Sequence, residues 1–182
     1  MYKLAKDISF IAHDIISKYV DTKNIAIDCT LGNGYDTDFL SEHFKRVISF
    51  DIQEEAVEKY KSKNKSNVEL VLDSHDKLEH YIKEKADCIL YNLGFLPGGD
   101  KKITTMADST KASIVQGLEL LVTGGIMLIN IYTGHNEGQK EKTCILNLTE
   151  KLPKNKYGVV KFEYVNRNGN APLLICIEKN QI

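Results

Sequence analysis

The sequence predicts an α/β fold: a doubly wound, mostly parallel sheet of seven strands with helices on both faces and a C-terminal antiparallel hairpin. Helix and strand signals alternate along the whole chain, which is typical of a parallel sheet covered by helices. The last two apolar runs, near 158–165 and 172–178, are separated only by a short polar turn, so antiparallel pairing is expected. We expect residues 1–182 to form a single domain.

Apolar spacing predicts each element in turn. Leu4, Ile8, Ile11 and Ile15 recur at helical spacing, which predicts a helix over residues 4–20. A long helix is expected from a cap at Thr104 or Thr105 to Val122, ended by Gly124-Gly125. The other expected helices are 36–43, 53–63, 78–82 and 137–150, and the other expected strands are 24–29, 46–50, 68–72, 86–91 and 126–132.

Composition excludes several classes of protein. The net charge of -1 disfavours a large nucleic-acid footprint, although lysines gather at 101–102 and within 151–167, where we expect any RNA contact. The four cysteines form no Cys-x-x-Cys pair and no metal-binding spacing, so buried reduced thiols, a cytoplasmic location and no metal are expected. There is no signal-peptide core and no apolar run of membrane-spanning length.

A glycine-rich turn follows the first expected strand, in Asp28-Cys29-Thr30-Leu31-Gly32-Asn33-Gly34-Tyr35-Asp36-Thr37. Glycines let the backbone approach a ligand, and the start of the next helix offers free N–H groups. A second acid, Asp51, ends the next strand, where a carboxylate can bind both ribose hydroxyls. These features predict an adenine-nucleoside site.

The residues of the turn favour one nucleoside ligand over others. A dinucleotide site carries a third glycine, where this chain has Thr37, and it faces a pyrophosphate. Asp28 and Asp36 would repel a pyrophosphate, but carboxylates suit a ligand with ammonium and sulfonium charges. We therefore expect S-adenosylmethionine (SAM) and disfavour a nicotinamide oxidoreductase. The alternative is an ordinary strand-turn-helix with a glycine-rich corner and no ligand.

Polar residues also follow the later strands, at the edge of the sheet where ligands of this fold class bind. Asp73 is expected near the adenine amino group, and Gln53 is expected to close over the adenine or the ribose. The residues predicted to bind the cofactor are Asp28, Thr30, Gly32, Asn33, Gly34, Asp36, Thr37, Asp51, Gln53, Asp73, Ser74, His75 and Asn92.

The segment Asn92-Leu93-Gly94-Phe95 places an amide three residues before an aromatic ring. It resembles the Asn-Pro-Pro-Tyr turn of amino-group methyltransferases, in which the Asn oxygen accepts a hydrogen bond from the target amine and the ring stacks on a base. A loop with a buried Phe is the alternative. His135 follows the fifth strand and is predicted either to accept a proton or to make a structural hydrogen bond. Three other histidines lie on expected helices and are expected to be exposed or capping: His13, His43 and His80.

Three segments together resemble the small rRNA methylase family, whose members are bacterial tRNA wobble-uridine methyltransferases (MnmM). They are the glycine turn at 28–37, Asn92-Leu93-Gly94-Phe95-Leu96-Pro97-Gly98-Gly99-Asp100-Lys101, and Tyr132-Thr133-Gly134-His135. The likeness covers nearly the whole chain and includes Asn166-Arg167-Asn168 followed by Ala171-Pro172. One departure is Phe95, where a Tyr is more often expected.

The resemblance implies a class I SAM-dependent methyltransferase fold and a specific reaction. The methyl group would pass from SAM to the exocyclic amine of 5-aminomethyl-2-thiouridine at the tRNA wobble position, giving 5-methylaminomethyl-2-thiouridine. The implied catalytic residues are Asn92, Phe95 and His135, and the expected partners are the tRNA anticodon loop and a second copy of the chain in a homodimer. The alternatives are a methyltransferase of ribosomal RNA or of a small-molecule amine, and a non-catalytic adenosine-ligand-binding protein.

Overall fold

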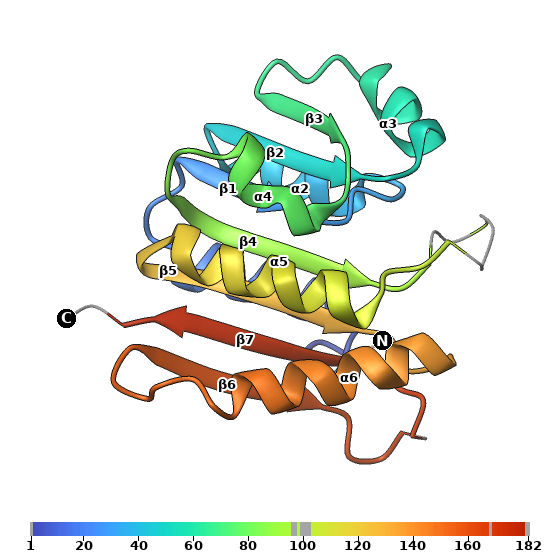
Figure 1. Cartoon of the computed structure of the whole chain (residues 1–182), viewed down its shortest axis with the longest axis vertical. Coiled ribbons are helices and arrows are strands. Elements are labelled where there is room, and N and C mark those ends of the chain that lie inside the picture. Colours follow the sequence, from blue (N-terminus) through green and yellow to red (C-terminus); the bar gives the residue numbers. More distant parts are fainter. Residues whose placement is uncertain (1, 96–97, 99–102, 168, 181–182) are drawn as a thin grey trace.

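The computed structural model describes residues 2–95, 98, 103–167 and 169–180. Within them, a seven-stranded sheet has the order β3-β2-β1-β4-β5-β7-β6, and only β7 runs antiparallel to its neighbours β5 and β6 (Figure 1). The predicted fold class is therefore confirmed. The strands are β1 (Ile25–Asp28), β2 (Arg46–Asp51), β3 (Val68–Leu72), β4 (Ala86–Leu93), β5 (Leu121–Ile131), β6 (Tyr157–Glu163) and β7 (Leu173–Lys179).

Helices cover both faces of this sheet (Figure 1). The helices are α1 (Ile8–Tyr19), α2 (Tyr35–His43), α3 (Glu54–Lys61), the 3-10 helix η1 (His75–Lys77), α4 (Leu78–Tyr81), α5 (Ala107–Leu120) and α6 (Asn136–Thr149). One apolar cluster joins α1 and α2 to one face of the sheet, and a second joins α4, α5 and α6 to the other. The inner strands are therefore covered on both faces, whereas the edge strands β3 and β6 each carry exposed residues.

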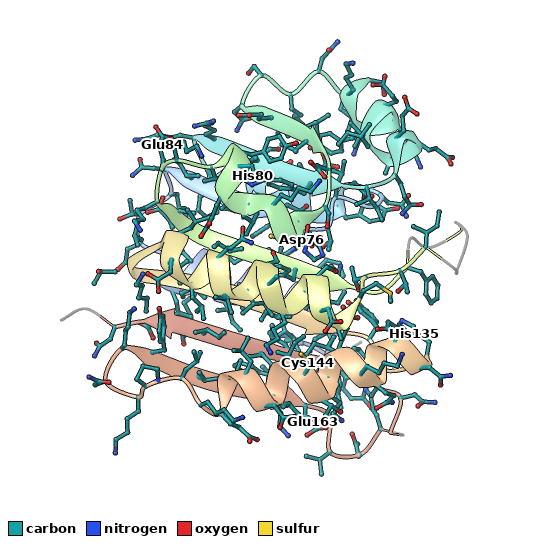
Figure 2. The ribbon with its side chains drawn as sticks, in the orientation of Figure 1. Asp76, His80, Glu84, His135, Cys144 and Glu163 are labelled. Atoms are coloured by element: carbon teal, nitrogen blue, oxygen red, sulfur yellow. The ribbon has the colours of Figure 1, made fainter. Side chains whose placement is uncertain are left out.

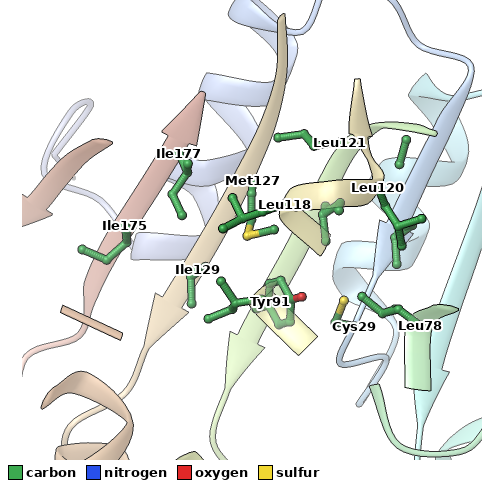
Figure 3. Packing of buried hydrophobic residues seen from close by; sticks show 14 of the residues in the cluster. Cys29, Leu78, Tyr91, Leu118, Leu120, Leu121, Met127, Ile129, Ile175 and Ile177 are labelled. Atoms are coloured by element: carbon green, nitrogen blue, oxygen red, sulfur yellow. The ribbon is translucent and has the colours of Figure 1, made fainter. Parts of the chain in front are cut away.

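The central strand β4 is buried along almost its whole length, as its apolar sequence predicts. Figure 3 shows Tyr91 of β4 packed among Met127, Ile129 and Cys29. The Tyr91 hydroxyl lies 2.9 Å from Ser113 Oγ on α5, so this buried polar group has a partner. The prediction of buried thiols holds for Cys29 and Cys88, whereas Cys144 and Cys176 are only half-buried.

The predicted bounds of two helices are wrong. The first helix begins at Ile8, because the Asp7 side chain accepts from Ser9 N and caps it there, and Leu4 lies outside the helix with 83% exposure. The long helix starts after Met106 and ends at Leu120, because Leu121 already pairs with Ala86 in the sheet. The residues 124 and 125 therefore form an irregular stretch inside β5 rather than the end of a helix.

The turn after β6 holds the N-terminal segment against the sheet. The Tyr164 hydroxyl donates to the Lys6 carbonyl, and Arg167 Nη2 donates to the Ala5 carbonyl at 2.8 Å. The Arg167 guanidinium also lies over the Tyr164 ring, 3.6 Å from its centroid. These contacts fix the chain just before α1 and therefore fix where α1 crosses the sheet. No helix among the described residues has the length and apolar character needed to cross a membrane.

Candidate active site

The parallel strands end together at one edge of the sheet, which we call the carboxyl edge (Figure 1). Asp28 and Asp51 end β1 and β2, and Asn92 is the penultimate residue of β4. The polar strand ends that the sequence singles out are thus brought to one side of the molecule. This edge is where ligands bind in open α/β sheets.

The glycine turn is shaped by backbone that favours glycine. Gly32 has a φ of 52° and Gly34 a φ of 80°. A Cβ on Gly34 would lie 2.2 Å from Cδ2 of Tyr60, so no larger residue fits there. Gly32 N donates to Asp51 Oδ2 at 2.8 Å, and Gln53 N donates to Asp51 Oδ1 at 2.9 Å. These bonds hold the Asp51 carboxylate beside the turn, as a ribose site requires.

The side chain of Asp28 stabilises the glycine turn through hydrogen bonds. Its side chain is fully buried and accepts hydrogen bonds from Thr30 N at 3.0 Å and from Thr37 Oγ1 at 2.6 Å. Burial, and then the nearby Asp36 carboxylate, raise the pKa of Asp28 to about 7. Thr37 therefore has a structural task in this turn: its hydroxyl links Asp28 to Ser49 Oγ, which lies 2.9 Å away.

A compact polar network joins α1, α2 and β4. His13 Nε2 lies 2.6 Å from Asp36 Oδ1, and Asn92 Nδ2 donates to Asp36 Oδ2 at 3.0 Å. Asn92 Nδ2 also lies 3.4 Å from Ser9 Oγ, and Asn92 N donates to Thr30 Oγ1 at 2.7 Å. By contrast, Asn92 Oδ1 is buried and has no hydrogen-bond partner among the described residues.

The prediction for His13 is therefore wrong. Its side chain is only 14% exposed, and its ring stacks on Phe39 with the centroids 3.9 Å apart. His43 and His80 are exposed, as predicted. The sequence does not show that His13 and Ser9 join this network, because both flank the apolar stripe of α1. Their i, i+4 spacing beside that stripe, with an acid at the start of α2, is the signal that identifies them.

The residues after β3 lead back toward α5, on which η1 packs. Asp73 accepts from Lys77 Nζ, Tyr81 OH and Ser74 N, each at 2.7 Å, and these bonds lower its pKa to about 2. His75 is buried at the start of η1, with its ring edge-on to Tyr91, and burial lowers its pKa to about 4. This histidine is therefore neutral at physiological pH.

The remaining predicted cofactor residues, Asn33 and Gln53, lie on the same edge. Lys59 Nζ donates to Asn33 Oδ1 at 3.3 Å, which links the glycine turn to α3. Gln53 precedes α3 and is half-buried, and its backbone N–H is the one that holds Asp51. These residues as a group fit SAM. The carboxyl edge carries a glycine turn, a carboxylate held for the ribose, a neutral buried histidine and the unpartnered oxygen of Asn92.

Phe95 and His135 come together beyond β4 and β5. Their ring centroids are 5.6 Å apart in an edge-to-face arrangement, and His135 Nε2 lies 3.3 Å from Thr104 Oγ1. Figure 2 shows His135 at the start of α6, on the carboxyl edge. A Cβ on Gly138 would lie 2.0 Å from the Tyr132 carbonyl oxygen, so glycine is needed for α6 to begin here.

A buried glutamate secures the chain on this side of the site. Glu141 Oε1 accepts from Thr110 Oγ1 at 2.8 Å, and Oε2 accepts from Thr105 Oγ1 at 3.0 Å. Thr105, one of the two residues expected to cap α5, thus binds Glu141 instead, and no local pattern in the sequence singles out Glu141. Leu96, Pro97 and the residues 99–102 of the family-like segment lie outside the described residues, and so do the lysines expected to contact RNA at 101 and 102.

The second lysine-rich segment is split between the two edges of the sheet. Tyr157 pairs with Lys179 at the edge opposite the site, and Lys156 Nζ lies 3.4 Å from Glu119 Oε1 there. Residues 151–156 therefore lie away from the carboxyl edge, and their contact with RNA stays a prediction. Arg167, in contrast, lies near the carboxyl edge, beside the segment that leads into α1.

Comparisons with known proteins agree with this geometry. A model of the family described as "Putative rRNA methylase" matches residues 47–178. The chain is 29% identical over 194 residues to the chloroplastic tRNA (mnm(5)s(2)U34)-methyltransferase of Arabidopsis thaliana, covering 97% of this chain and 70% of that protein.

Solved structures share the fold over almost their whole length. An rRNA-methylase structure from Clostridium thermocellum is 35% identical, with a TM-score of 0.91, covering 96% of this chain and 98% of that one. A methyltransferase from Streptococcus mutans in complex with SAH is 37% identical, with a TM-score of 0.88 and the same two coverages, 96% and 98%. The fold, the nucleoside-type site and these relatives together show that the chain belongs to the rRNA methylase family and is a SAM-dependent methyltransferase.

Proposed function

We propose that this enzyme methylates the exocyclic amine of 5-aminomethyl-2-thiouridine at the wobble position of tRNA, giving 5-methylaminomethyl-2-thiouridine. The observation that carries the proposal is the Asn92 amide, whose buried Oδ1 has no partner among the described residues. An acceptor of this kind suits the N–H of an amine. The Arabidopsis relative is named for the nucleoside mnm(5)s(2)U34 of tRNA, which supports this choice of substrate.

In this proposal the cofactor lies across the ends of β1, β2 and β3. Asp51 binds the ribose, and the glycine turn with Asp36 accommodates the amino-acid part. Asp73, Ser74 and His75 face the adenine. SAM supplies a methyl group carried on a positively charged sulfur.

The chain's own residues prepare the amine. An alkylamine is mostly protonated at neutral pH, and it must lose a proton before its lone pair can attack. A partly desolvated site disfavours the ammonium form, and Asn92 Oδ1 accepts one of the remaining N–H groups. The reaction is then an in-line displacement governed by positioning.

Phe95 contacts the base of the substrate, and His135 takes up the proton that the amine loses. The Phe95 ring stacks on the uracil, which is available because the anticodon loop is single-stranded. His135 lies against the Phe95 ring and accepts or relays the proton. A ring without a hydroxyl is sufficient for stacking, so Phe in place of Tyr is compatible with the proposal.

The test is mass spectrometry of tRNA nucleosides from a strain lacking the gene, with purified enzyme added back to the extracted tRNA. We expect 5-aminomethyl-2-thiouridine to accumulate in the strain and to be converted on addition of enzyme and SAM. An unchanged tRNA profile would reject the proposal. Loss of a methylated nucleoside from ribosomal RNA alone would transfer the activity to that substrate, which is the one the family description names.

A further inference from the structure

The orientation of the Asn92 amide is determined by its neighbour. Nδ2 lies 3.0 Å from Asp36 Oδ2, and an ionised carboxylate can only accept hydrogen bonds. The amide must therefore present its NH2 group to Asp36. Its oxygen then faces the other way, where it is buried without a partner among the described residues.

Asp36 is itself held in place by His13. The two side chains are 2.6 Å apart and only 7% and 14% exposed. The His13 ring stacks on Phe39 at an interplanar angle of 3°, which fixes the plane in which Nε2 meets the carboxylate. Asp36 stands in the first turn of α2, immediately after the glycine turn, so its backbone position is also fixed.

We propose that Asp36, held by His13, sets the orientation of the Asn92 amide so that its oxygen faces the amine to be methylated. His13 and Asp36 are thus positioning residues that act through Asn92. This inference rests on the proposed function in one respect, namely that the substrate group is an amine.

The chemistry explains why the orientation matters. An Asn oxygen accepts an amine N–H and leaves the nitrogen lone pair free to attack. A reversed amide would present two N–H donors, which would bind the lone pair that has to form the new bond. One amide can therefore promote or block the reaction, depending on which atom the carboxylate holds.

Two substitutions of His13 test the inference through activity. His13→Leu removes the group that holds Asp36, and we expect kcat at saturating SAM to fall about tenfold; because Asp36 is also placed at the amino-acid part of SAM, the affinity for SAM is measured separately. His13→Gln places an amide N–H near the position of Nε2 and should restore at least half of the wild-type kcat. The matched control is His43→Leu, because His43 packs on the same Phe39 ring but contacts no carboxylate. That variant should keep the wild-type kcat.

A second measurement does not depend on the substrate. The measurement is the NMR spectrum of protein labelled with 15N-asparagine. The side-chain signal of Asn92 is identified as the one that is absent from the spectrum of Asn92→Ala. It should shift in Asp36→Asn and in His13→Leu, and it should return toward its wild-type position in His13→Gln. If the Asn92 signal shifts in this way but the enzyme does not methylate the aminomethyl nucleoside, the proposed function is rejected and the inference about Asn92 stands. A His13→Leu variant with a wild-type kcat, or with an unmoved Asn92 signal, would overturn the inference.

Discussion

The two sides of the site are built differently. On the α1–α2 side, defined by His13, Asp36 and Asn92, polar groups are joined by bonds of 2.6 and 3.0 Å. On the α6 side, defined by Phe95 and His135, the two rings meet edge to face, and the His135 side chain makes a longer contact of 3.3 Å with Thr104 Oγ1. A bonded network fixes a reacting group, whereas a ring surface accommodates a flat base. We therefore expect substitutions on the α1–α2 side to change kcat, and loss of the ring on the α6 side to change the apparent affinity for RNA.

The largest expected effect is on the α1–α2 side. Asn92→Ala removes the oxygen that accepts from the amine, so kcat should fall by about 10²–10³-fold, the cost of losing one oriented polar group. SAM affinity measured by calorimetry should change little. If KM for tRNA rises while kcat stays the same, the division between the two sides is wrong.

His135 lies on the α6 side but is proposed to move a proton, so its loss should change kcat rather than the affinity for RNA. His135→Ala tests this exception. At neutral pH kcat should fall by on the order of 10²-fold. The loss should shrink as the pH rises, because more of the substrate amine is then already unprotonated. A rate equal to that of wild type across the pH range would reduce His135 to a hydrogen-bond partner of Thr104.

Asp51→Ala extends the comparison to the cofactor. The affinity for SAM should weaken by about 1.5–3 kcal/mol, the scale of hydrogen bonds to a charged group. Asp51→Asn is the matched control, because its amide oxygen can still accept from one of Gly32 N or Gln53 N. Calorimetry that shows unchanged affinity for the Ala variant would exclude Asp51 from the ribose site.

Phe95→Ala tests whether the α6 side acts in RNA binding. Stacking of one base on an aromatic ring is worth about 1–3 kcal/mol, so KM for tRNA should rise while single-turnover kcat stays close to wild type. Phe95→Tyr should preserve KM, because the ring is retained. A fall in kcat at unchanged KM would place the ring in the chemical step rather than in binding.

The last prediction concerns stability and does not involve activity. The pKa of Asp28 is raised from 3.8 to about 7, so between these values the folded state holds a proton that the unfolded chain has lost. Its contribution to stability is present below pH 3.8 and is lost as the pH rises through about 7. The free energy of unfolding of wild type minus that of Asp28→Asn should therefore fall by up to ~1.4 kcal/mol per pH unit in this window. Urea unfolding across the pH range measures the difference, and a constant or rising difference would contradict the assignment.

Much of the fold follows from local sequence. The mostly parallel sheet and the terminal hairpin could be predicted because helix and strand signals alternate along the chain and only a short turn separates the last two strands. The boundary between α5 and β5 could not be predicted from the glycines, because the pairing of Leu121 with Ala86 is a tertiary contact. The same limit applies to the basic segments: sequence proximity to Arg167 does not reveal that Lys156 lies at the opposite edge.

In the site, too, features set by local sequence could be predicted, and features set by long-range contacts could not. The placement of Asp51 and Asn92 on the carboxyl edge could be predicted because both lie at or next to the end of a parallel strand. His13 could not, because its role depends on how α1 packs across the sheet, which no local pattern specifies. Glu141 was missed for a similar reason, since its partners Thr105 and Thr110 lie more than 30 residues away in the sequence.

The contacts of Tyr164 and Arg167 with residues 5 and 6 have a consequence for biosynthesis. A ribosome releases α1 first and β7 last, yet β7 lies between β5 and β6, and Leu174 of β7 packs in the same cluster as Ile8. Part of the apolar surface that α1 packs against is therefore missing until β7 has been synthesised.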